Sequence, residues 1–222
     1  MKLDGFRVDV DERNGGNVMA VLVTGGARSG KSRFAEQYAR RQGAGGMYIA
    51  TSQVLDEEMR ERVEHHQKRR AEMTESSFAH KQAQSDAAPF TWRTIEEPFE
   101  LVDAIRQYPD EIVLVDCLTL WLTNWLLRYE AEPDCETKVM DKVEQLAQLI
   151  VERDRRVILV TNEVGDSVVP EYRLGRQFRD LAGWMNQRIA AACEEVFLVT
   201  AGIPVELKRI AYQWADGAER GK

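Results

Sequence analysis

One eight-residue segment constrains the fold of this chain more than any other feature. Gly25-Gly26-Ala27-Arg28-Ser29-Gly30-Lys31-Ser32 fits the pattern G-x-x-x-x-G-K-[ST] in full, between the apolar run Val18–Val23 and the helix-like stretch Arg33–Gln42. A strand that ends at glycine and continues as a helix directs backbone N–H groups and the positive helix end at one point. The segment therefore predicts a phosphate-binding loop for a nucleoside triphosphate, with Lys31 facing the β and γ phosphates and Ser32 facing Mg²⁺.

The rest of the chain alternates short β-branched runs with longer amphipathic stretches, the pattern of βα units in a mostly parallel sheet. The predicted strands are Met47–Ala50, Thr91–Ile95, Ile112–Val115, Val157–Thr161 and Val196–Val199. The predicted helices after the loop include Leu118–Arg128, Cys135–Arg155 and Arg173–Cys193, the second ending in a basic cluster of Arg153, Arg155 and Arg156. Ile112–Val115 is apolar throughout, which is typical of a strand covered on both faces. We expect a three-layer α/β P-loop domain.

Length and local composition favour one domain. The chain has 222 residues, 44% of them hydrophobic, which is enough for a full core. We expect residues 1–17 to be a poorly ordered leader and residues 18–222 to form a single nucleotide-binding domain. The stretch Glu75–Pro89, rich in Ser, Ala and Gln, is expected to be a surface insertion near residues 75–89.

Charge and cysteine content narrow the function classes. Acidic residues outnumber basic ones by 37 to 30, so no overall positive field attracts nucleic acid, and we expect no nucleic-acid partner. The three cysteines lack a C-x-x-C pair, which argues against a disulfide framework and a structural zinc. No apolar run approaches the roughly 20 residues of a membrane span. These features indicate a cytoplasmic protein without a membrane span.

A second chemical signal is the acidic residue that ends a predicted strand. Asp116 follows Ile112–Val115 directly. In P-loop proteins an acidic residue at the carboxyl end of a neighbouring strand completes the Mg²⁺ shell begun by the loop, so Ser32 and Asp116 are the candidate metal residues. Asp116 also fits a simple capping role for the helix that follows it, and the two roles can coexist.

A third signal lies in Leu55–Arg70, which has acidic residues in its first turn and a histidine pair further along. On a helix, His66 shares a face with Arg62, Arg69 and Arg70. Neighbouring cations disfavour a protonated imidazole, so His66 is the candidate nucleophile, beside groups that can hold phosphate oxygens. His65 has Glu61 at the corresponding position and is the weaker candidate. Periodicity alone favours a solvated charged helix that carries two exposed histidines.

Several blocks of the chain, in order, resemble one enzyme family. They include the loop Leu22–Arg33, Tyr48–Gln53 continuing to His65-His66, Trp92-Arg93-Thr94 with Glu96, Val115–Thr119 with Thr123-Asn124, Val160–Gly165, and Val169-Pro170-Glu171 through Arg179–Gly183 to Asn186-Gln187. Together they resemble the bifunctional adenosylcobinamide kinase/adenosylcobinamide-phosphate guanylyltransferases of cobalamin (vitamin B12) biosynthesis. The resemblance runs from about Ala20 to about Lys208.

The resemblance implies a RecA-like P-loop fold, a homotrimer and two reactions on adenosylcobinamide. One phosphorylates its aminopropanol hydroxyl with a nucleoside triphosphate, GTP or ATP. The other attaches GMP from GTP to adenosylcobinamide phosphate through a guanylyl-histidine and releases pyrophosphate. By position in the motif, the guanylylated histidine is His66. The implied nucleotide contacts are Gly25, Gly26, Ala27, Arg28, Ser29, Gly30, Lys31, Ser32, Ala50, Thr51, Ser52, Gln67, Lys68, Arg69, Arg70, Glu96 and Asp116.

The chain departs from the family pattern in one place. The stretch between the histidine pair and Trp92 is longer than in the family, so any base or ribose contacts there do not transfer directly. Two other functions share the loop: a monofunctional P-loop small-molecule kinase and a RecA-like nucleotide-dependent ATPase. A GTPase-type switch is disfavoured, because Thr161-Asn162-Glu163-Val164 lacks the Lys and Asp of a guanine-binding N-K-x-D motif.

Overall fold

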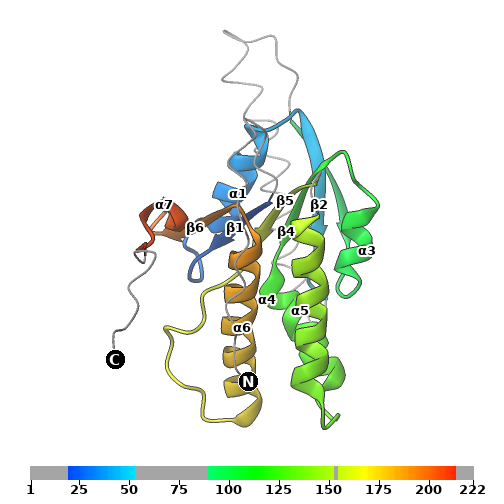
Figure 1. Cartoon of the computed structure of the whole chain (residues 1–222), viewed down its shortest axis with the longest axis vertical. Coiled ribbons are helices and arrows are strands. Elements are labelled where there is room, and N and C mark those ends of the chain that lie inside the picture. Colours follow the sequence, from blue (N-terminus) through cyan, green and yellow to red (C-terminus); the bar gives the residue numbers. More distant parts are fainter. Residues whose placement is uncertain (1–19, 54–89, 153–154, 214–222) are drawn as a thin grey trace, which may run out of the picture.

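The computed structural model describes residues 20–53, 90–152 and 155–213. They form a seven-stranded sheet in the order β3-β2-β4-β5-β1-β6-β7 (Figure 1). The strands are β1 (Ala20–Thr24), β2 (Gly45–Ala50), β3 (Thr91–Glu96), β4 (Ile112–Asp116), β5 (Arg156–Val160), β6 (Glu195–Thr200) and β7 (Ile203–Glu206). All neighbouring strands pair in parallel except β7, which is antiparallel to β6. The predicted mostly parallel α/β sheet is confirmed.

Helices cover both faces of this sheet. They are α1 (Lys31–Arg40), α3 (Leu101–Arg106), α4 (Leu118–Tyr129), α5 (Cys135–Val151), α6 (Arg173–Ala192) and the short α7 (Leu207–Ile210). One hydrophobic cluster joins one face of the sheet to α1, and a second joins the other face to α3, α4, α5 and α6. The predicted three layers are therefore present. One strand, β5, separates the loop-bearing β1 from β4, and the sheet agrees with the RecA-like P-loop fold that the resemblance implies.

The central strands explain why the carboxyl ends meet at one edge. Residues of β1, β4 and β5 alternate between the two clusters, so each strand is apolar on both faces, as parallel sheets require. Val160 of β5 pairs with Val23 of β1 on one side and with Asp116 of β4 on the other. The three strands thus end in register. We call this end of the sheet the carboxyl edge.

Two long helices extend past that edge. Helices α5 and α6 run side by side, as Figure 1 shows, and are joined by a two-pronged ion pair in which the Arg188 Nε and Nη2 atoms each lie 2.6 Å from an oxygen of Glu144. The hydrogen bonds from Arg188 lower the pKa of the Glu144 carboxyl. Both helices begin beyond the carboxyl edge and end near the start of the next strand. Their first turns therefore project past the edge where the phosphate-binding loop lies.

Some sequence-based boundaries are corrected. Helix α5 ends at Val151, not Arg155, because Glu152 leaves the helical region with ψ 112°. Arg156 belongs to β5, and its guanidinium donates to the backbone oxygens of Gln42 and Asp110, so it does not cap a helix. The elements α3, β7 and α7 were not predicted; α3 and α7 are short, with six and four residues.

In the described ranges no helix is long and apolar enough to span a bilayer. Residues 1–17 and Glu75–Pro89 lie outside the described residues.

The core makes a direct stability prediction. Leu159 is fully buried at the centre of the sheet, whereas Val168 is 90% exposed. We expect Leu159→Ala to lower the free energy of unfolding by about 2–5 kcal/mol, because it leaves a cavity in a layer that cannot collapse. The control Val168→Ala should change it by less than about 0.5 kcal/mol. Urea unfolding followed by circular dichroism measures both, and equal effects would contradict the assignment of the core.

Candidate nucleotide site

The predicted phosphate-binding loop lies between β1 and α1, at the carboxyl edge. Its first residue, Gly25, has φ 152° and passes so close to β6 that a Cβ atom would lie 2.4 Å from the Val199 carbonyl oxygen. A side chain there would also meet Ser29 Oγ at 2.8 Å. Glycine is therefore required at position 25 by contact with the neighbouring strand as well as by the backbone conformation.

The loop is built to receive an anion. In the part of the chain that is described, the backbone N–H groups of Gly30, Lys31 and Ser32 have no hydrogen-bond acceptor at the start of α1. The Ser29 hydroxyl is buried and also lacks a partner there. The Lys31 side chain is only 8% exposed, and its Nζ donates to the Gly26 carbonyl at 3.1 Å. An ammonium and unpaired N–H groups at a helix N-terminus fit a polyphosphate.

The turn between β6 and β7 supports the phosphate-binding loop. The Gly202 N–H donates to the Ser29 carbonyl at 2.9 Å. Ala201 and Gly202, with φ 51° and 80°, form the two-residue turn of the β6–β7 hairpin. Positive φ at both positions is the mark of a type I′ turn, whose twist matches that of the paired strands. The hairpin therefore fixes the middle of the loop to the sheet.

Asp116 lies at the end of β4, where the sequence predicted a metal residue. Its Oδ2 accepts a hydrogen bond of 2.9 Å from the Tyr48 hydroxyl. The N-cap of α4 is Cys117, with no side-chain cap hydrogen bond, so the carboxylate does not cap that helix. Asp116 pairs with Val160 of β5, and Val160 pairs in turn with Val23 of β1, the strand that leads into the loop. The carboxylate therefore faces the same region as the loop.

Register brings two more predicted contacts to this edge. Ala50 of β2 pairs with Asp116 on one side and with Glu96 of β3 on the other. Thr51 follows, with its side chain fully buried: its hydroxyl donates to the Cys117 carbonyl at 2.7 Å and accepts from the Cys117 N–H at 2.9 Å. Thr51 thus fastens β2 to β4, while the half-buried Ser52 follows it at the edge.

Glu96 is distant from the loop. Three strands, β2, β4 and β5, separate β3 from β1, which at about 4.8 Å per strand is roughly 19 Å. Its side chain is exposed. The predicted nucleophile His66 and the predicted contacts Gln67, Lys68, Arg69 and Arg70 lie outside the described residues.

Sequence reasoning assigned no role to the polar residues that hold the strand ends. Asn124 of α4 donates from Nδ2 to the carbonyls of Thr51 and Pro98, both at 2.9 Å. Asn186 of α6 donates to the Asn162 carbonyl at 3.1 Å and accepts from Thr161 Oγ1 at 2.8 Å. The available signal was a buried amide on an otherwise apolar helical face, since such a group needs partners.

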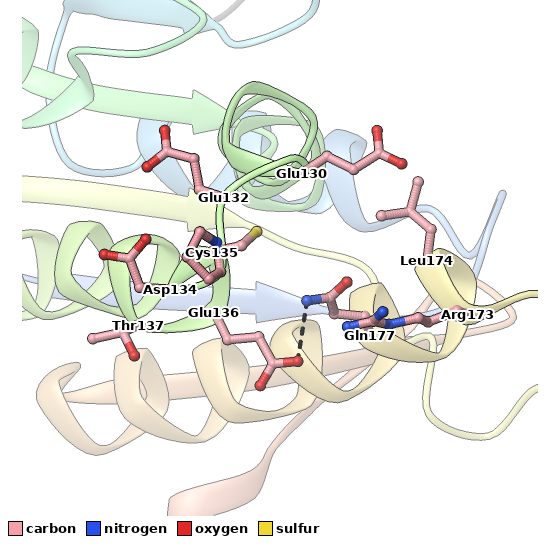
Figure 2. Close-up of a pocket in the computed structure, with 10 residues that line it drawn as sticks. Glu130, Glu132, Asp134, Cys135, Glu136, Thr137, Arg173, Leu174 and Gln177 are labelled. Carbon is pink, nitrogen blue, oxygen red and sulfur yellow. Dashed lines mark hydrogen bonds between the residues drawn. The ribbon is translucent and has the colours of Figure 1, made fainter.

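A pocket elsewhere is chemically different. It holds about 440 Å³ between the first turns of α5 and α6 (Figure 2) and is lined by Glu130, Glu132, Pro133, Asp134, Cys135, Glu136, Thr137, Arg173, Leu174 and Gln177. Gln177 donates to Glu136 at 3.0 Å across it. The α6 residues that line the pocket, from Arg173 to Gln177, precede Asn186 in the helix, so the pocket lies roughly 14–20 Å from the carboxyl edge at about 1.5 Å per residue. Its surplus of carboxylates does not suit a phosphate.

The cysteines are not reactive groups of this site. All three are buried and free. Burial first, and then the Asp116 charge, raise the pKa of Cys117 to about 11, and burial raises that of Cys193 to about 12. Burial also raises the pKa of Cys135. Within residues 20–53, 90–152 and 155–213, no cluster of His, Cys, Asp and Glu is arranged to hold a metal by itself.

A family model described as "Cobinamide kinase / cobinamide phosphate guanyltransferase" matches residues 21–207. The chain belongs to this family. It is 42% identical over 200 residues to the "Bifunctional adenosylcobalamin biosynthesis protein CobU" of Escherichia coli (strain K12), covering 86% of this chain and 100% of that protein. The resemblance drawn from the sequence is confirmed, and with it the assignment to a bifunctional transferase family of cobalamin biosynthesis.

Two further relatives agree. The protein of the same name from Salmonella typhimurium is 40% identical over 200 residues, covering 86% of this chain and 100% of that protein. The "Bifunctional adenosylcobalamin biosynthesis protein CobP" of Pseudomonas aeruginosa is 42% identical over 192 residues, covering 86% of this chain and 98% of that protein. Among solved structures, an ATPase domain aligns with a TM-score of 0.44 at 14% identity, over 81% of this chain and 68% of that chain.

The same substitution at two glycines should have opposite effects. Gly25→Ala should lower the free energy of unfolding by about 1–3 kcal/mol, because the new Cβ meets the Val199 carbonyl in a backbone conformation that alanine avoids. Gly183 lies in α6, and a Cβ there would meet nothing within 4 Å. Gly183→Ala should stabilise the protein by about 0.5–1 kcal/mol. Denaturant unfolding measures both, and a neutral Gly25→Ala would contradict the close approach of the loop to β6.

The buried thiols give a pH prediction. At pH 8 no cysteine should react with a thiol reagent until the protein unfolds, when all three should react. Because the folded pKa values of Cys117 and Cys193 lie above the ordinary thiol value of 9.0, the unfolded chain loses these protons first. Stability should therefore fall as the pH rises from about 9 through 11. Rapid labelling of the native protein at pH 8 would show that the thiols are accessible.

Proposed function

We propose that this chain phosphorylates the aminopropanol hydroxyl of adenosylcobinamide with a nucleoside triphosphate, and then transfers GMP from GTP to adenosylcobinamide phosphate. The observation that carries the proposal is the gathering, at one edge of the sheet, of the loop Gly25–Ser32 with Asp116 and Ala50, followed by Glu96 one strand further along. The family resemblance implies these positions as nucleotide contacts, and they come from four separate parts of the sequence.

The edge also suggests how the nucleotide lies. Lys31 and the unpaired N–H groups of the loop would hold the phosphates at β1. Glu96 would meet the ribose or guanine end, since the roughly 19 Å between β1 and β3 is on the scale of an extended nucleoside triphosphate. Between them the buried Thr51 would keep β2 and β4 together beneath the nucleotide. We propose GTP as the nucleotide of the second reaction, and GTP or ATP for the first.

Ser32 and Asp116 are the residues proposed to hold Mg²⁺. A hydroxyl at the start of α1 and a carboxylate at the end of β4 are oxygen donors of the kind that Mg²⁺ prefers. When bound, the ion would neutralise charge on the phosphates. The hydrogen bond from Tyr48 fixes one oxygen of Asp116 and leaves the other for the ion or its water.

For the guanylyl step we propose His66 as the nucleophile. Its imidazole would attack the α phosphorus of GTP and pyrophosphate would leave; the phosphate of the acceptor would then displace the histidine. Arg62, Arg69 and Arg70 lie at helical spacing from His66 and would hold the charged oxygens during both displacements. Two displacements at one phosphorus need only one nucleotide site.

The remaining expectations complete the proposal. We propose that the enzyme acts as a homotrimer, as the family resemblance implies. From the cysteine content and the net charge we also propose that it is cytoplasmic and has no nucleic-acid partner. Residues 1–17 are proposed to be a poorly ordered leader, and Glu75–Pro89 a surface insertion in the single domain formed by residues 18–222.

The fate of labelled GTP tests the function. Incubation with GTP labelled at the α phosphate should leave acid-labile, base-stable label on the parent protein. His66→Ala should lose this label and guanylyl transfer but keep cobinamide phosphorylation, because phosphorylation needs the loop and the acceptor only. The matched control, His65→Ala, should retain label.

Lys31→Ala separates the loop from the histidine. It should abolish both reactions while the circular dichroism spectrum stays that of the parent, since Lys31 is a charge on the β and γ phosphates. Labelling that stops with His65→Ala alone would move the nucleophile by one residue. A parent protein that phosphorylates cobinamide but is never labelled would support a monofunctional kinase.

A further inference from the structure

Asn162 lies two residues after Val160, the last residue of β5, and side chains from two helices hold its backbone. Its N–H donates to the Thr119 hydroxyl of α4 at 2.9 Å, and its carbonyl accepts from Asn186 Nδ2 of α6 at 3.1 Å. Asn186 is itself oriented by Thr161, whose hydroxyl donates to Asn186 Oδ1 at 2.8 Å. Three side chains thus fix the position of one residue at the carboxyl edge.

The strand pairing places Asn162 in the centre of the site. Before it, the Thr161 N–H donates to the Val23 carbonyl at 3.0 Å; after it, the Glu163 N–H donates to the Gly25 carbonyl at 3.1 Å. On the other side of β5 lies the end of β4, where Asp116 pairs with Val160. Asn162 therefore lies about one strand spacing, roughly 4.8 Å, from the start of the loop, and two residues beyond the level of Asp116 at the end of β4.

The alternation of side chains places the Asn162 side chain on the α1 face of the sheet. Val160 belongs to the cluster on the α1 face, and Thr161 turns to the other face, where it meets Asn186. The next residue returns to the α1 face. Asp116 lies on that face as well, because it bonds Tyr48 of the same cluster. The Asn162 side chain is thus on the side where α1 begins.

The carboxamide of Asn162 is not used by the fold. It is partly exposed and has no hydrogen-bond partner among the residues that the structure describes. By contrast, Asn124 and Asn186 use their side chains to join backbone segments. A carboxamide offers two N–H donors, and a neutral donor beside Lys31 suits a phosphate oxygen without repelling the ammonium.

We propose that Asn162 Nδ2 donates a hydrogen bond to the terminal phosphate of the bound nucleoside triphosphate, which makes Asn162 a catalytic residue of the kinase step. This inference rests on the proposed function. In that step the acceptor hydroxyl oxygen forms a bond to the γ phosphorus, and the bond from that phosphorus to the β,γ-bridging oxygen breaks. The nucleoside diphosphate leaves with the electron pair, and the hydroxyl proton passes to water.

A fixed donor at the transferred phosphate affects the two reactions differently. The Asn162 carboxamide would stabilise the charge on the γ phosphoryl oxygens during transfer. Thr119 and Asn186 already hold the Asn162 backbone, so the residue needs no rearrangement to do this. Guanylylation of the histidine breaks the bond at the α phosphorus instead, so the terminal phosphate only leaves with pyrophosphate. The kinase step should need Asn162, and the guanylyl step should not.

Three variants of the full chain test the proposal: Asn162→Ala, Asn162→Asp and the control Ser167→Ala. Ser167 lies in the same loop and bonds only the Val164 carbonyl there, at 2.8 Å through its hydroxyl. For each protein we would measure kcat for phosphorylation of adenosylcobinamide, the Kd of a non-hydrolysable GTP analogue, and protein labelling by α-labelled GTP. Ser167→Ala should match the parent in all three.

Asn162→Ala should reduce the kinase kcat by about 100-fold, the usual effect of removing one donor to a developing charge. Its analogue Kd and labelling should stay within about threefold of the parent. Asn162→Asp, which has the same shape but a negative acceptor, should be slower still. A kinase kcat within threefold of the parent in either variant would overturn the proposal. So would a parallel loss of kcat, analogue binding and labelling, which indicates a structural role. A parent that does not phosphorylate cobinamide would overturn the proposed function together with this inference.

Discussion

Everything at the carboxyl edge depends on the parallel pairing of β5 with β1 on one side and β4 on the other. Val160 faces both Val23 and Asp116, so the strand that carries the loop and the strand that carries the carboxylate end at the same level. This pairing is stable because the three strands are apolar on both faces and are covered by α1 on one side and by α4, α5 and α6 on the other. A shift of one residue in either register would turn Asp116 away from the loop.

The candidate site combines polar groups that are hydrogen-bonded within the fold with polar groups that have no hydrogen-bond partner in the described residues. Thr51, Thr119, Asn124 and Asn186 are buried or partly buried, and their side-chain hydrogen bonds join the strand ends to one another and to two helices. The N–H groups of Gly30, Lys31 and Ser32 and the Asn162 carboxamide have no partner in the described ranges. In a chain with a net charge of −7, this local set of donors, with Lys31, is what makes phosphate binding possible.

The sequence was sufficient for the fold class because the strongest signals were local. A complete loop motif and short β-branched or apolar runs predicted the six parallel strands to within a few residues. The predicted boundaries were wrong where contacts between distant segments determine the structure. Arg156, for example, lies in β5 and bonds the backbone oxygens of Gln42 and Asp110. β7 was missed because its turn is Ala-Gly, without the Asn-Gly or Asp-Gly signature of a type I′ turn. For the site, Lys31 and Asp116 followed from spacing, but Tyr48 and Asn186 did not, since their roles arise only when distant segments meet.

The close approach of Gly25 to Val199 has a consequence for how such loops change over time. The sheet itself excludes a side chain at this position, whether or not a phosphate is ever bound. A descendant of this chain that no longer bound a nucleotide would still keep Gly25. Lys31, whose Nζ bonds only the Gly26 carbonyl among the described residues, could be replaced. In a relative with this fold, loss of the lysine, and not of the first glycine, would therefore indicate that nucleotide binding has been lost.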